Sequence, residues 1–147
     1  YTPMFLLLKK ISAAVSVLVL SVVMVSGSGP EAEISMLVRQ RTDIMNEYFG
    51  GHILYKEAAA RIEKVENGRL LDEDLAAMND FFQTDIEEIT DYHITEVDIT
   101  NMDDTLICAV VTVEWEISGI EGKDEIENIY SVIAEKKENS YKLVQFF

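Results

Sequence analysis

The sequence predicts an α+β domain in which three N-terminal helices pack on a curved four-stranded antiparallel sheet. Apolar residues recur at three- and four-residue spacing from about residue 31 to residue 88, and they alternate with period two from there onward. Short polar segments join the alternating stretches, as in an antiparallel meander. A chain of 147 residues can build one compact core but not two. Helices that precede such strands are typical of the α+β class.

The first 30 residues have the order of an export segment followed by a linker. Lys9 and Lys10 precede 17 uncharged residues, Ile11 to Gly27. Basic, then apolar, then small residues make up an export signal, but this apolar length falls between a cleaved signal peptide and a membrane-spanning helix. Gly27 and Gly29 offer small residues for cleavage. Release of the domain and retention by a signal anchor therefore both stay open.

The position of the two lysines predicts where the rest of the chain works. Positive charge before an apolar stretch stays on the cytoplasmic side, which places the remainder outside the cytoplasm. We expect an extracytoplasmic domain over residues 31–147, either secreted or anchored to the cell membrane by the N-terminal segment. The linker "GSGP", which ends at Pro30, has no apolar side chain to bury, so the domain should fold without the first 30 residues.

Three amphipathic helices are expected before residue 89. The first runs from Glu31 to the glycine pair at Gly50, and the stem of Arg41 lies on its apolar stripe. The second runs from Leu54 to Glu66 and stops at Gly68. The third begins near Asp72 as N-cap and extends toward Ile89. Its apolar positions are Leu75, Met78, Phe81, Phe82, Ile86 and Ile89.

Four strands follow, read from "HITEVDIT", the long run Thr105 to Ser118, "IENIYSVIAEKK" and "YKLVQFF". The long strand has one wholly apolar face, on which Trp115 is expected to be a core residue. Glu114 and Glu116 lie on its other face, where charged side chains keep the sheet solvated and discourage edge pairing. Cys108, the single cysteine, is expected to be a small buried hydrophobe.

The charge of the domain excludes one class of partner. After Lys9 and Lys10, the remaining 10 basic side chains face 27 acidic ones, a net charge of −17. Nucleic-acid binding needs clustered lysine and arginine, so nucleic acid is excluded as a partner. An acidic surface is also repelled by anionic lipid. Contact with the membrane is therefore expected only through the N-terminal segment.

Several common chemistries have no motif in this chain. One cysteine permits no internal disulfide or CxxC pair. His52 and His93 lie far apart in the sequence without a histidine partner at metal-ligand spacing, so no metal site is expected. "NMDD" at Asn101 to Asp104 reads as a turn, because it lacks the alternating oxygen ligands of a calcium loop. No P-loop, GxGxxG or GxSxG occurs, and we expect no cofactor.

The order of elements resembles the nuclear-transport-factor-two-like superfamily over Glu31 to Phe147. The segments that carry the resemblance are "YKEAAARIEKVENGRLLDEDLAAMNDFF" as a helix pair and "LICAVVTVEWEI" as the long strand. It is a resemblance of element order, without a signature motif. It implies a strongly bent sheet around the helices, forming a cone whose pocket is an enzyme site in some members and a partner surface in others. The alternative, a cystatin-like fold, normally has one long helix.

Two functions from different classes stay open. The first is a non-enzymatic binding domain at the cell envelope, with an envelope protein or a small molecule as its partner. The second is a small lyase or isomerase, a class of that superfamily in which an Asp or His base and Tyr or Asp donors project into the cone. Asp91, Tyr92 and His93 are the candidate catalytic residues for this second function. A loop between helix and strand is the expected setting of these three residues, and such a loop is usually wet.

Overall fold

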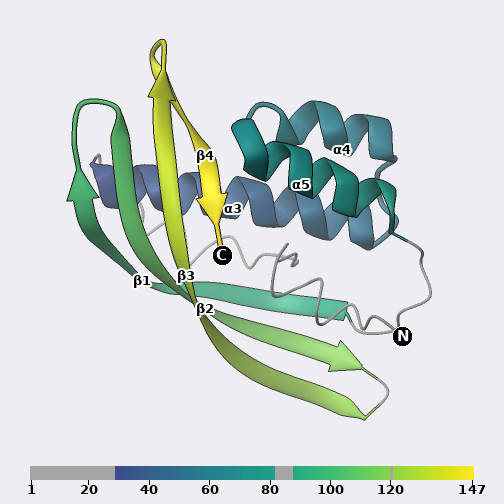
Figure 1. Cartoon of the computed structure of the whole chain (residues 1–147). Helices are drawn as coiled ribbons and strands as arrows, with labels where there is room; N and C mark the ends of the chain where they lie inside the picture. The colour runs from purple at the N-terminus through teal and green to yellow at the C-terminus, as the bar shows by residue number, and fades with distance from the viewer. Residues whose placement is uncertain (1–28, 82–87, 120) are drawn as a thin grey trace.

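The computed structural model describes residues 29–81, 88–119 and 121–147. It confirms the α+β class, with three helices followed by a four-stranded antiparallel sheet (Figure 1). The elements are α3 (Pro30–Phe49), α4 (Tyr55–Ile62), α5 (Gly68–Asn79), β1 (Glu88–Met102), β2 (Leu106–Gly119), β3 (Gly122–Lys137) and β4 (Ser140–Phe146). The export segment with Gly27, and the positions Phe82 and Ile86, lie outside the described residues. Among the described helices, none is long and apolar enough to cross a membrane.

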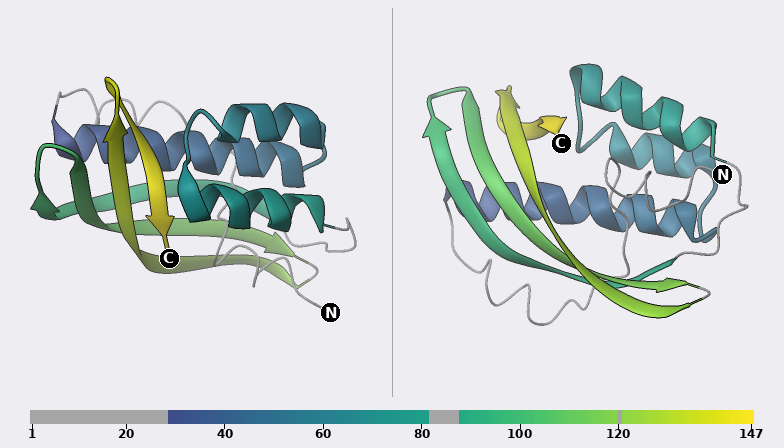
Figure 2. Two further views of the ribbon diagram at one scale, coloured as in Figure 1. Left: turned by 45° about the horizontal axis from the view of Figure 1, so that its top comes forward. Right: turned by 60° about the horizontal axis from the view of Figure 1, so that its bottom comes forward.

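The sheet is a meander whose strand order is that of the sequence, β1-β2-β3-β4. Its long strands bend strongly, and α3 lies in the hollow of the curve (Figure 2). β2 and β3 pair without a register shift from Leu106 to Gly119. β4 is short and pairs only with Val132–Lys137, the second half of β3. The first half of β3 therefore has β2 as its only partner strand among the described residues and forms an edge of the sheet there.

The hollow face of the sheet and the helices enclose the core. Every second residue of β2 from Ile107 to Ile117 is buried, as the alternation predicts, and Trp115 is 3% exposed. The predicted stripe of α3 is also buried, apart from the half-buried Tyr48. Cys108 lies half-buried on the opposite face of β2, so its expected place in the core is wrong. It follows the outward alternation of its own strand.

The boundaries between the second and third helices differ from the prediction. α4 ends at Ile62, and Leu54 stands before it as N-cap with 80% of its surface exposed. Gly68 does not stop α4 but opens α5, where its φ of 64° suits a residue without a side chain. Asp72 therefore lies inside α5 instead of capping it. The prediction takes Gly68 as the end of the second helix, but that helix ends at Ile62. A short turn follows, and Gly68 is the first residue of the third helix.

The first strand begins earlier than the prediction. β1 starts at Glu88, so Ile89 is a buried strand residue and not part of a third helix. The predicted turn at Asn101 to Asp104 is confirmed in outline. Asp103 accepts hydrogen bonds from the backbone N–H groups of Thr105 and Leu106, both at 2.8 Å. These bonds lower the pKa of Asp103 and close the connection to β2.

Candidate functional site

A groove of about 260 Å³ crosses the face of the sheet that turns away from the helices. It runs over β1, β2 and β3 near the end of the β2–β3 hairpin at which the chain turns between Gly119 and Gly122. We call it the acidic groove, because five carboxylates and one imidazole line it. The lining residues are Asp91, His93, Glu114, Trp115, Glu116, Glu125, Ile126 and Glu127.

Strand pairing brings these ionisable side chains together. They form two rows across the three strands: His93, Glu114 and Glu127 in one, and Asp91, Glu116 and Glu125 in the other. Residues directly opposite each other have Cβ atoms about 4.5–5.5 Å apart. Each row therefore places two glutamates of β2 and β3 side by side. Carboxylates in such positions repel each other, and a bound cationic group would relieve that repulsion.

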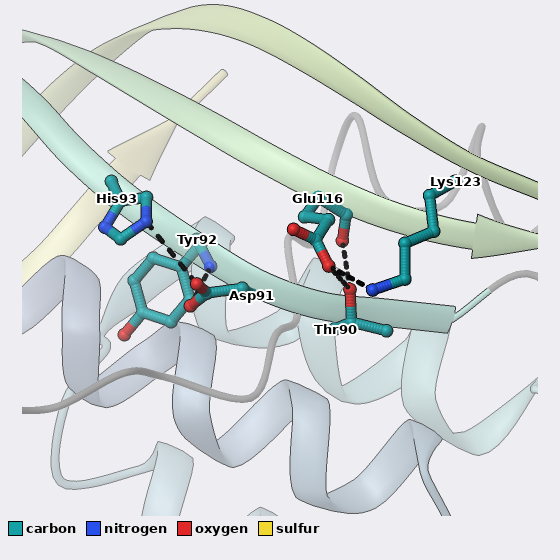
Figure 3. A network of polar contacts seen from close by, with 6 residues as sticks. All are labelled: Thr90, Asp91, Tyr92, His93, Glu116 and Lys123. Carbon is teal, nitrogen blue, oxygen red and sulfur yellow. Dashed lines mark hydrogen bonds and ion pairs between the residues drawn. The ribbon is translucent and has the colours of Figure 1, made fainter.

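One carboxylate of the groove is held by neighbouring groups (Figure 3). Glu116 Oε1 accepts hydrogen bonds from Thr90 Oγ1 at 2.7 Å and from Lys123 Nζ at 3.1 Å. The bond from Thr90 and the ammonium of Lys123 lower the pKa of Glu116. Beside it, His93 Nε2 lies 3.4 Å from Asp91 Oδ2, with the His93 side chain 42% exposed. These groups are open to solvent.

The three predicted catalytic residues lie in β1, not in a loop, and they do not meet in one apolar pocket. Asp91 and His93 line the acidic groove. Tyr92 points to the other face, where it is 1% exposed and its hydroxyl donates a 2.9 Å hydrogen bond to Asp43 of α3. Burial, followed by the charge of Asp43, raises the pKa of Tyr92 far above its usual range. Because side chains alternate along β1, the hydroxyl of Tyr92 lies on the opposite face of the sheet from Asp91 and His93.

Three further tyrosines, Tyr48, Tyr130 and Tyr55, have structural partners or face solvent. Tyr48 donates to the carbonyl oxygen of Met78 at 2.7 Å, which ties α3 to α5. The hydroxyl of Tyr130 accepts a hydrogen bond from Trp115 Nε1 at 3.1 Å inside the core. Tyr55 is 37% exposed on α4. None of the three faces the acidic groove.

The residues of the groove do not form a metal centre. Within residues 29–81, 88–119 and 121–147, no three His, Cys, Asp or Glu side chains converge closely enough to hold a metal ion. Along the two rows, the carboxylates follow the spacing of the strands instead of surrounding one point. The arrangement suits a ligand whose positive charges are spread over several ångströms, such as a segment of a basic protein.

A second polar cluster lies inside the fold and was missed in the sequence. Arg41 was expected to bury only its stem, but the whole side chain is 0% exposed. Its Nε donates to Glu66 Oε2 at 2.7 Å and to Asp74 Oδ2 at 2.9 Å. The guanidinium also lies over the ring of Phe146, 4.3 Å from the centroid. The cluster of Arg41, Glu66 and Asp74, here called the buried triad, joins α3, α5 and β4.

One carboxyl group of the buried triad, that of Glu66, keeps its proton near neutral pH. Burial raises the pKa of Glu66 to about 10; the hydrogen bond with Asp74 and the charge of Asp74 add to this rise, whereas the attraction of Arg41 opposes it. Burial alone would lower the pKa of Arg41, but Asp74 and Glu66 outweigh it and the pKa is raised. Near neutral pH, the carboxyl group of Glu66 is therefore neutral beside the guanidinium of Arg41. An uncompensated charge in the interior would be far more costly.

Sequence signals for these two sites were of unequal strength. The alternation of β2 placed Glu114 and Glu116 on the outer face, but their partners on β1 and β3 depend on register, which alternation alone does not give. For the buried triad, the one signal was Arg41 within an apolar stripe. Its acidic partners lie 25 and 33 residues away, with nothing local to connect them.

Comparison with known proteins supports the fold alone. No protein-family model and no curated protein matches this chain. Among solved structures, the chain is similar to the intermembrane space region of the chloroplast protein ARC6. The TM-score is 0.51 at 14% sequence identity, and the alignment covers 82% of this chain and 97% of the other. An identity this low gives no information on shared chemistry.

Proposed function

We propose that this chain is a non-enzymatic, extracytoplasmic binding domain that holds a basic partner protein at the cell envelope. The observation that carries the proposal is the acidic groove, with its five carboxylates on three adjacent strands. Glu114 lies directly opposite Glu127, and Glu116 directly opposite Glu125. Like charges in these positions destabilise a sheet. A positively charged partner converts that repulsion into attraction.

The electrostatics of the whole domain favour the same kind of partner. A net charge of −17 beyond the two N-terminal lysines draws basic proteins toward the surface over longer distances. The groove then gathers five carboxylates within one small area of this surface. Such complementarity increases the association rate and weakens as salt is added.

The proposed location rests on the N-terminal segment. Lys9 and Lys10 before the apolar stretch Ile11 to Gly27 are the basis for placing the domain outside the cytoplasm. The ARC6 region to which the fold is similar also lies between two membranes. Membership in the nuclear-transport-factor-two-like superfamily is part of the same proposal, and its support is the order of three helices before a bent sheet.

The lyase or isomerase alternative has less support in the geometry. General acid–base catalysis needs a base and a donor positioned within reach of one substrate. Asp91 and His93 stand in an open groove, whereas Tyr92 is buried behind the strand. We therefore do not propose a catalytic role for these three residues.

Binding by the full chain tests the proposal. We would tag the chain, solubilise envelope membranes in mild detergent and identify the captured proteins. The double variant Glu114→Gln with Glu127→Gln should lose the basic partner, because it removes two charges from the groove. The matched control, Glu57→Gln with Glu63→Gln, changes the same number of exposed charges on and just after α4 and should retain it.

Two results would contradict the proposal. Equal capture by both double variants would mean that the acidic groove is not the binding surface. Fractionation that finds the full chain only in the cytosol would remove the proposed location.

The dependence of capture on salt is a further measurement. A loss of capture when the salt concentration is raised from about 0.05 to 0.5 M is the expected result for a charge-dependent complex.

A further inference from the structure

One edge of the sheet is regular and uncovered among the described residues. β4 pairs with Val132–Lys137 and leaves the first half of β3, residues 122–130, with a single partner strand, β2. This half pairs with β2 without a bulge. Unpaired N–H and C=O groups along such an edge can accept a further strand. We call residues 123–129 the open edge.

The two other edges of the sheet are blocked. β1 has three register shifts along its pairing with β2, and bulges of this kind break the regular row of backbone groups. The outer edge of β4 is covered by the segment before α5. Leu143 N–H donates to the carbonyl of Val65 at 2.8 Å, and Asn67 N–H donates to the carbonyl of Leu143 at 2.9 Å. Among the described residues, the open edge has neither a register shift nor a covering segment.

The direction of the backbone groups at the open edge follows from its neighbour. Ser131 exchanges two backbone hydrogen bonds with Phe147, at 2.7 and 3.1 Å, on the side of β4. Backbone groups alternate in direction along a regular strand. Ile129, Glu127 and Glu125 therefore direct their N–H and C=O groups toward the same open side. An added strand would continue the line of β4.

The side chains on these residues define what the added strand must carry. Glu125 and Glu127 belong to the acidic groove, and Ile129 has 65% of its surface exposed. Directly opposite positions on paired strands share one face and interact. An antiparallel strand would thus meet an apolar position first and two acidic positions next. The matching pattern, read from N to C, is apolar-x-basic-x-basic.

Charge argues against a second copy of the chain as the occupant. The antiparallel register that pairs residues 123–129 of two copies over their full length sets Glu125 of each copy opposite Glu127 of the other. Two pairs of like charges would then face each other, which is destabilising. Charged residues on an exposed edge are a common protection against self-association. The same charges favour a basic strand.

We propose that the open edge of β3 binds an extended basic segment of the partner protein by adding it to the sheet as a fifth, antiparallel strand. The charge of the partner rests on the function proposed above. The mode of binding, through the backbone, is independent of it. Main-chain hydrogen bonds supply affinity in such complexes, and the alternate side chains supply specificity.

A pair of N-methylated peptides tests the backbone contact. The probe is the synthetic peptide TVTKTKT with blocked ends, whose Val and two Lys would lie opposite Ile129, Glu127 and Glu125. Methylation of the amides of Val and both Lys removes the donors that face β3, whereas methylation of three Thr amides leaves them. Binding to the full chain in detergent, measured by anisotropy of a labelled probe, should weaken at least about tenfold for the first peptide only.

A variant of the edge provides a second measurement. Ile129→Pro removes the N–H that faces the open side without removing a bond to β2, and it should reduce probe binding, whereas Ile129→Thr keeps that N–H. Circular dichroism verifies that both variants fold, and if the proline variant does not, the peptide pair still decides.

The outcomes separate the two proposals. Equal binding of both methylated peptides, with loss in high salt, would overturn strand addition and leave a charge-dependent partner at the acidic groove. Absence of binding by the unmethylated probe would overturn strand addition, and the capture experiment would then decide the proposed function alone. Sedimentation showing a dimer that Ile129→Pro dissolves would assign the open edge to a second copy and overturn the basic partner there.

Discussion

Charged residues are buried beside one half of the sheet and exposed to solvent on the other half. In the half that β4 completes, Arg41, Glu66 and Asp74 are sealed from solvent beneath Phe146. In the half formed by the β2–β3 hairpin, glutamates stand in solvent with like charges opposite one another. The first arrangement pairs Arg41 with Glu66 and Asp74 inside the fold and ties helices to strands. The second leaves them available to an outside partner, so the difference separates maintenance of the fold from recognition.

The largest expected effect is removal of the cation from the buried triad. Arg41→Ala leaves two carboxyl groups in the interior without their common donor, and loss of one member of such a cluster costs about 3–5 kcal/mol. Chemical denaturation of the full chain measures this loss as a shift of the unfolding midpoint. Arg69→Ala is the control, because Arg69 pairs with Glu73 at the surface of α5 and is 89% exposed. A loss as small as that of the control would mean that the buried triad does not stabilise the fold.

The next effect, smaller than the first for each pH unit crossed, is a dependence of stability on pH that originates in Glu66. Its pKa is raised from 4.5 to about 10 in the folded protein. The neutral carboxyl therefore contributes stability that is complete below pH 4.5 and is lost as the pH rises toward 10. Each pH unit in this window changes the free energy of unfolding by at most about 1.4 kcal/mol. Unfolding measured from pH 5 to 9 should show the wild-type chain losing stability relative to Glu66→Gln.

A matched variant separates this effect from general alkaline destabilisation. Glu73→Gln makes the same chemical change at an exposed position of the same helix. It should follow the wild-type pH dependence, whereas Glu66→Gln should be flatter. If the two variants behave alike, Glu66 does not take up a proton on folding and the one-proton description of the buried triad is wrong.

The smallest effect is expected in the hairpin half, and it has the opposite sign. Glu114→Gln with Glu127→Gln removes a pair of like charges that face each other across β2 and β3. The change should stabilise the fold by about 0.2–1 kcal/mol, because the repulsion disappears. Thermal unfolding at low salt measures the gain, which should shrink as salt screens the charges. A loss of stability would show that these glutamates support the sheet and are not reserved for a partner.

Prediction from the sequence succeeded where periodicity alone decides structure. Ile107 to Ile117 alternate cleanly, and the buried face of β2 follows from that alternation. The stripe of α3 was equally clear, because three- and four-residue spacing leaves one face of the helix apolar. Boundaries were less predictable. Gly68 signals both the end and the start of a helix, and only packing decides which one applies.

Both polar clusters depend on contacts between distant parts of the chain. The acidic rows require the register of β1 on β2, and β1 contains three bulges that the sequence does not announce. The sequence predicts Asp91 and His93 as catalytic residues, because an acid–base pair lies next to the hydroxyl of Tyr92 in the chain. The structure places them next to Glu114 and Glu116 because strands pair there. Arg41 finds Glu66 and Asp74 only when α3, α5 and β4 come together.

The covering of β4 has a consequence for the order of folding. β4 contacts the first described helix through Phe146 over Arg41, and it is hydrogen-bonded to the segment before α5 through Leu143. These contacts join residues separated by most of the domain, and contacts of that kind are made slowly because a long loop must first be closed. Until residues 140–146 have been synthesised, β4 cannot cover the charged groups of the buried triad. A chain that crosses a membrane from its N-terminus would therefore reach the far side before its fold can close.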